Sequence, residues 1–244
     1  MNKNALRGFA VSGLLVMGLT ACGGAGTSTD AASAPASETA APTPTPTPAK
    51  DFTLEELNTV LGQIKDKQGT RLSVTSSADL SGSMEQTKAL MSQIDVQPAV
   101  CKDMAMGSMA QPMDGMKAAV GVSQDAASAS VTTISLGAGL GDDAKTKVEA
   151  SSDQLAQCST MTMSGPTGAS TLTVTDLAGK KPANAMVAYR MDTELPTGEK
   201  GSVIMAQTVK QNVVITTVGV GGGSEEAALA NVNNLLDQAV ELIK

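Results

Sequence analysis

The segment Ser202–Val220, SVIMAQTVKQNVVITTVGV, carries the strongest indication of the fold. Two runs rich in Val, Ile and Thr flank the pair Gln211-Asn212, a pattern typical of a β-hairpin closed by a tight turn. Gly221-Gly222-Gly223 ends the second run, and Ser224 then stands where a helix cap is expected. An apolar stripe with helical spacing follows, made of Leu229, Val232, Leu235, Leu236, Ala239, Val240 and Ile243. Because this stripe must be buried, we expect the last helix to lie across one face of a sheet.

Working outward from the hairpin, the same alternation predicts further strands. They are Arg71–Ser76, Met116–Val122, Ser130–Leu136, Ser159–Ser164, Ser170–Asp176 and Ala185–Leu195. Three helices are expected between them. One begins with a capping box at Thr53 and Glu56 and ends by Gly69, one begins at Ser81 or Ser83 and ends before Pro98, and one runs from Asp142-Asp143 to about Gln157. The short run around Cys101 carries no clear prediction. This order predicts an α+β fold: a mainly antiparallel β-sheet flanked by helices, with the C-terminal amphipathic helix packed on the sheet.

The N-terminus has the layout of a secretory signal. Lys3 and Arg7 form its basic part, and Phe9 to Leu19 form an apolar run of roughly 11 residues, too short to span a bilayer. Leu19-Thr20-Ala21-Cys22 resembles the lipobox of bacterial lipoproteins, in which the cysteine is diacylated and the chain is cut before it. We therefore expect residues 1–21 to be a signal peptide and Cys22 to carry lipid that holds the protein on the outer face of a membrane. The alternative is an ordinary signal peptide with a chance cysteine.

Residues 22–50 follow as a spacer of Gly, Ala, Ser, Thr and Pro without apolar periodicity. This composition predicts a disordered linker, and its Thr-Pro repeat at 41–48 favours an extended, semi-rigid polyproline II conformation. The remaining residues, 51–244, are long enough for one substantial core and form the predicted extracytoplasmic domain. No later segment reaches 18 consecutive apolar residues, so no second anchor is expected.

Charge and composition exclude several classes of function. Removal of residues 1–21 leaves 15 of the 17 basic residues against all 24 acidic ones, a net charge of −9, which disfavours nucleic acid as a partner. Histidine is absent, which excludes a Ser-His-Asp or Cys-His catalytic unit and every histidine-ligated metal site. Neither of the serine-nucleophile motifs G-x-S-x-G and S-x-x-K occurs. The glycine clusters at 137–141 and 219–223 lack the spacing of phosphate-binding loops, and each precedes an acidic pair that would repel a phosphate. We therefore expect a protein that is not an enzyme and that uses no cofactor.

The cysteines support export. With Cys22 assigned to lipid, Cys101 and Cys158 remain as an even pair, and a disulfide bond between them is the default interpretation in an oxidising compartment. Two buried free thiols are the competing interpretation.

Methionine is unusually frequent, and five thioethers fall within 13 residues: Met104, Met106, Met109, Met113 and Met116. Thioethers bind Cu(I), so this run is a weak candidate for a copper site. The simpler interpretation is that methionine fills core space in a chain whose 14 methionines are spread from end to end and whose aromatic content is 1%.

The order of motifs resembles the PknH-like domain, the extracellular sensor domain of actinobacterial transmembrane Ser/Thr kinases that also occurs in free-standing lipoproteins. The motifs are LNTVLG at 57–62, V-x-P-x-x-C at 96–101, QLAQC at 154–158 and NVVI at 212–215. The chain departs from that family at Leu155, where members often have Trp, and in lacking a second cysteine pair. The resemblance implies a sheet with helices around a ligand-receiving cleft, and a Cys101–Cys158 bond.

These observations together predict a membrane-anchored, extracytoplasmic lipoprotein whose domain binds a small ligand, an envelope polymer or another protein. The alternative is a carrier of lipid or Cu(I) with an apolar or methionine-lined cavity. A polar cleft or a flat face would favour the sensor-like interpretation, and a Met- and Leu-lined cavity would favour the carrier.

Overall fold

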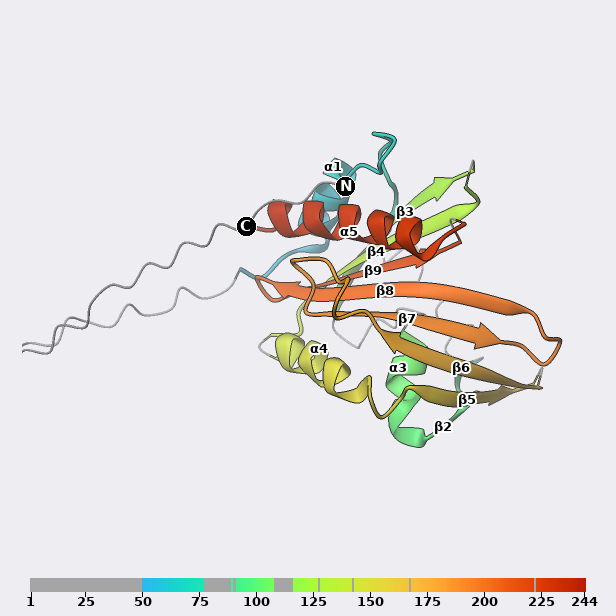
Figure 1. The fold of residues 1–244 in the computed structure, drawn as a ribbon. Helices are drawn as coiled ribbons and strands as arrows, with labels where there is room; N and C mark the ends of the chain where they lie inside the picture. The colour runs from blue at the N-terminus through green and yellow to red at the C-terminus, as the bar shows by residue number, and fades with distance from the viewer. Residues whose placement is uncertain are drawn as a thin grey trace, which may run out of the picture. The chain divides into compact units, whose positions relative to one another are not determined.

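The computed structural model describes residues 50–76, 89, 91–107, 116–126, 128–141, 143–166, 168–221 and 223–244. Residues 47–244 form one compact unit. Its centre is a nine-stranded sheet with the order β1-β3-β4-β9-β8-β7-β6-β5-β2, in which every neighbouring pair is antiparallel. The predicted α+β class, the antiparallel sheet and the packing of the last helix on it are confirmed (Figure 1).

The strands agree with the sequence patterns except at one edge. Their bounds are β1 Ser73–Ser76, β2 Asp95–Gln97, β3 Lys117–Asp125, β4 Ser130–Ala138, β5 Thr160–Gly165, β6 Gly168–Asp176, β7 Val187–Glu194, β8 Lys200–Lys210 and β9 Val213–Val220. Gln211 and Asn212 both have positive φ, 48° and 57°, as the tight turn between β8 and β9 requires. The prediction that residues 95–97 belong to a helix was wrong. They form edge strand β2, because Val96 pairs with Met163 of β5 and is buried.

Four helices complete the described fold: α1 Leu54–Gln63, α3 Lys102–Gly107, α4 Asp143–Gln154 and α5 Glu225–Leu242. The capping box at Thr53 and Glu56 and the Ser224 cap of α5 are both present. Helix α1 ends at Gln63 rather than near Gly69, because Ile64 is already extended and Lys65 bridges to Arg71. A one-turn 3₁₀ helix, Ala99–Cys101, precedes α3. Residues 81–88 and 90 of the predicted second helix lie outside the described residues.

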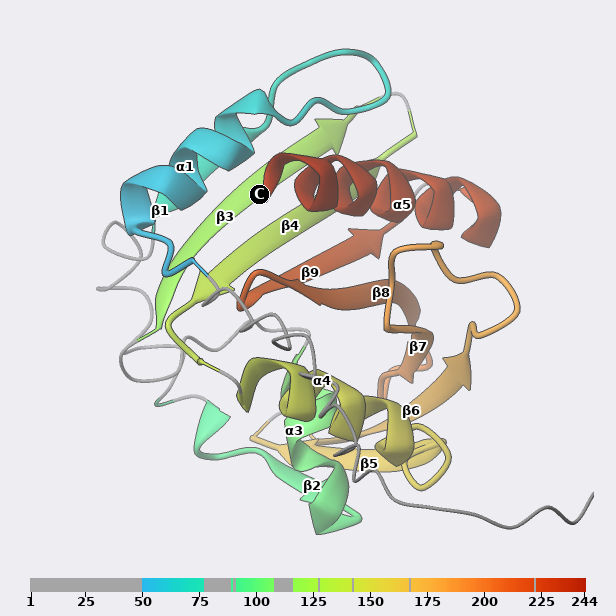
Figure 2. The same cartoon turned by 90° about the vertical axis from the view of Figure 1, so that its left-hand side faces the viewer.

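The sheet carries helices on both faces. Helix α5 packs on β4, β9 and β8 and α1 on β1 and β3, whereas α4 packs on β7, β8 and β9 and α3 contacts β2 (Figure 2). We call the first side the α5 face and the other side the α4 face. Successive residues of β8 point to opposite faces: Ile204 belongs to the core under α5 and Met205 to the core under α4.

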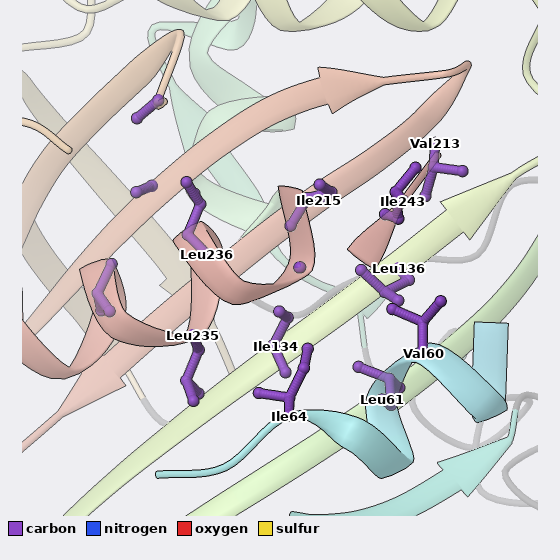
Figure 3. Packing of buried hydrophobic residues seen from close by; sticks show 14 of the residues in the cluster. Val60, Leu61, Ile64, Ile134, Leu136, Val213, Ile215, Leu235, Leu236 and Ile243 are labelled. Atoms are coloured by element: carbon purple, nitrogen blue, oxygen red, sulfur yellow. The ribbon is translucent and has the colours of Figure 1, made fainter. Parts of the chain in front are cut away.

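The core under α5 is aliphatic. Figure 3 shows residues of α1 and α5 converging on β4 and β9, and those buried to 1% exposure or less include Leu61, Ile64, Ile134, Leu136, Val213, Ile215, Leu235, Leu236 and Ile243. Full burial of each such side chain contributes about 1.5–3 kcal/mol relative to exposure. The apolar stripe read from the sequence is therefore what holds α5 on the sheet. Among the described residues, no helix is long and apolar enough to cross a bilayer.

Candidate functional site

The predicted disulfide is present. Cys101 and Cys158 are joined at 2.08 Å, their Cα atoms are 5.6 Å apart, and both residues are fully buried in the core under α4. The bond ties the 3₁₀ helix before α3 to the turn that follows α4. Cys22 lies outside the described residues, so its lipidation stays a prediction.

The structure describes three of the five methionines in the candidate copper run. Met104 and Met106 lie on α3 and are buried, each 5% exposed, whereas Met109 and Met113 lie outside the described residues. Met116 precedes β3 and lies against Gly137, where an added Cβ would meet its sulfur at 2.8 Å. The copper site therefore stays a prediction.

Other methionines fill the core under α4, together with Met104. Met161, Met191 and Met205 are at most 4% exposed, and the Tyr189 hydroxyl donates a hydrogen bond to the Met205 sulfur at 2.9 Å. This packing role is the one expected in a chain with few aromatic residues.

A polar hollow lies at one end of the α5 face. It is open to solvent and measures about 250 Å³ including its open mouth. Three segments far apart in sequence line it: the loop after α1, the β3–β4 hairpin and the middle of α5. The lining residues are Asp66, Lys67, Gln68, Ser123, Asp125, Ser130, Thr132, Asn231, Asn234 and Leu235.

The hairpin contributes four polar side chains on the α5 face. Ser123 pairs with Thr132 and Asp125 with Ser130, so all four point to the same side of the sheet as Ile134. At this end of β3 and β4, the aliphatic core therefore gives way to polar side chains that form the base of the hollow. Ser130 and Thr132 are 3% and 4% exposed.

The loop after α1 contributes the first carboxylate. Asp66 accepts hydrogen bonds from the backbone N–H groups of Gln68 at 3.0 Å and Thr70 at 2.8 Å, which shapes the loop, and from the Ser123 hydroxyl at 3.3 Å. The Gln68 side-chain amide donates to Asp125 at 3.2 Å. Asp125 also accepts from the Ser128 hydroxyl at 2.7 Å. Both carboxylates are therefore held in place by local hydrogen bonds.

Helix α5 lines the other side of the hollow with Asn231, Asn234 and Leu235. The Asn234 amide N–H donates to the Lys65 carbonyl at 3.1 Å, so its carbonyl oxygen is not used in that bond. Thr132 and Asn231 line the hollow beside Asn234.

The chemistry available in the hollow is that of oxygen ligands. Carboxylate, hydroxyl and amide oxygens converge there, with one exposed ammonium group, Lys67, at the rim. No group of three or more acidic or cysteine side chains that could hold a metal is found among the residues the structure describes. The arrangement can bind a small polar or cationic group.

Sequence reasoning missed this hollow. A usable signal was present in the strands: Ser123, Asp125, Ser130 and Thr132 are polar at positions that alternation places on the buried side. Asn231 and Asn234 likewise interrupt the apolar stripe of the last helix. What the sequence did not supply was the proximity of these three segments.

A second charged cluster has a structural role. Glu225, in the first turn of α5, accepts from Lys180 at 2.9 Å and from Arg190 of β7, which also bonds Asp192 at 2.9 Å. The hydrogen bonds from Lys180 and Arg190 lower the pKa of Glu225. These contacts connect the N-terminus of α5 to β7 and to the loop after β6.

Comparisons with known proteins give weak likenesses. No family model matches the chain, and no curated protein matches its sequence. Among solved structures, the extracellular domain of PknH from Mycobacterium tuberculosis is similar at 15% identity and a TM-score of 0.47, over 79% of this chain and 99% of that one. A putative uncharacterized protein from Mycobacterium smegmatis, an Rv0999 ortholog, is similar at 13% identity and a TM-score of 0.39, over 62% and 76%. Neither likeness carries an argument about ligand or activity.

Proposed function

We propose that this protein is an extracytoplasmic lipoprotein, anchored through Cys22, whose domain from residue 51 to 244 binds a ligand or a protein without catalysing a reaction. The observation that carries the proposal is the lipobox-like Leu19–Cys22 stretch after a basic and apolar leader. The buried Cys101–Cys158 bond supports it, because stable structural disulfides belong to oxidising compartments. Two lipid chains on one cysteine give stable anchoring where one chain does not.

The polar hollow favours the sensor-like alternative over the carrier. Its lining contains ten residues, of which Leu235 alone is aliphatic and none is methionine. The methionines that the structure describes in the core under α4 serve as packing residues. A polar hollow that opens to solvent suits recognition of a polar group better than transport of a lipid chain.

Lipidation is tested by growing the bacterium that makes the protein with an alkyne fatty acid. We expect label on the wild-type chain and none on Cys22→Ser, which should also retain residues 1–21 because cleavage before the cysteine requires the lipid. Cys101→Ser is the matched control and should still be labelled. Label that persists on Cys22→Ser, or no label on the wild type, would contradict the proposal.

Binding is tested by native mass spectrometry of the protein purified from the same host. A co-purified polar molecule, peptide or protein supports the proposed function. Co-purified lipid or copper would instead favour a carrier.

A further inference from the structure

We draw no further inference here: the strongest candidate, the exposed apolar patch where Val131 of β4 pairs with Val220 of β9 on the α4 face, carries nothing because no described residue shows what covers it.

Discussion

Breaking the Cys101–Cys158 bond should remove a large part of the stability of the domain. The bond closes a loop of 57 residues, and constraining such a loop in the unfolded chain is worth about 4 kcal/mol in the chain-entropy model. Domains of this kind are stable by about 5–15 kcal/mol in total, so the loss would be a major fraction. The physical reason lies in the unfolded state, which gains conformations once the crosslink is gone.

The measurement is urea unfolding followed by far-ultraviolet circular dichroism, in a Cys22→Ser background so that only this pair can react. At a slope of about 2 kcal/mol per molar urea, we expect the midpoint of Cys101→Ala/Cys158→Ala to fall by about 2 M. The double variant also leaves small voids where the buried sulfurs stood, so wild-type protein unfolded in the presence of a reductant serves as the control that keeps every heavy atom. A loss below about 1 kcal/mol in both experiments would refute the loop-entropy reasoning.

Three further perturbations address other parts of the fold. Gly219→Ala places a Cβ 2.9 Å from Val232 of α5, and the displaced helix should cost about 1–3 kcal/mol in urea unfolding. The pKa of Glu56 is lowered to about 2, first by the hydrogen bond from Lys50, so the stability that this carboxylate contributes is present above pH 4.5 and is lost as the pH falls towards 2. Glu56→Gln should therefore flatten the pH dependence of the unfolding free energy in that window. Burial raises the pKa of Tyr189, so tyrosinate absorbance should appear only as the protein unfolds, and stability should fall above about pH 10, where the unfolded phenol ionises.

Each of these experiments has its own check. Gly179→Ala has nothing within 4 Å of the added Cβ and should be close to neutral, so an equal loss at both glycines would argue against the helix contact. Glu55→Gln is the neighbouring control for the pH experiment, and identical acid profiles for the two variants would contradict the role given to Glu56. Tyr189 is the sole tyrosine and the chain has no tryptophan, so early tyrosinate absorbance with an intact fold would disprove its burial.

The elements that were predicted well are those specified by neighbouring residues. The β8–β9 hairpin follows from strand-forming runs around Gln211-Asn212, and α5 follows from the Ser224 cap and a stripe of helical period. The elements that were missed depend on distant partners. β2 has three residues and exists because Val96 pairs with Met163 of β5, which is distant in the sequence, and the local pattern at 95–97 does not encode that pairing.

For the candidate site, too, the features set by composition could be predicted, and those set by contacts between distant segments could not. The cysteine pair could be predicted, because setting Cys22 aside leaves an even pair in a chain expected to be exported, and this depends on composition rather than on geometry. The polar hollow could not, because its three segments meet only when β4 pairs with β9 and α5 crosses both. The polar residues at inward-facing positions of β3 and β4 could be recognised in the sequence as exceptions to the apolar pattern. The sequence did not show that they line the same hollow.

The sequence was sufficient to predict the cysteine pair, most strands and the two capped helices, and to indicate a candidate leader and anchor, since each depends on contacts within a few residues or on composition. The tertiary structure alone decided strand order, the short edge strand β2 and the convergence of Asp66, Asp125 and Asn231 on one hollow. The physical reason is that the long-range pairings which set this arrangement are selected by burial of the whole sheet on both faces. No local run of residues carries that information.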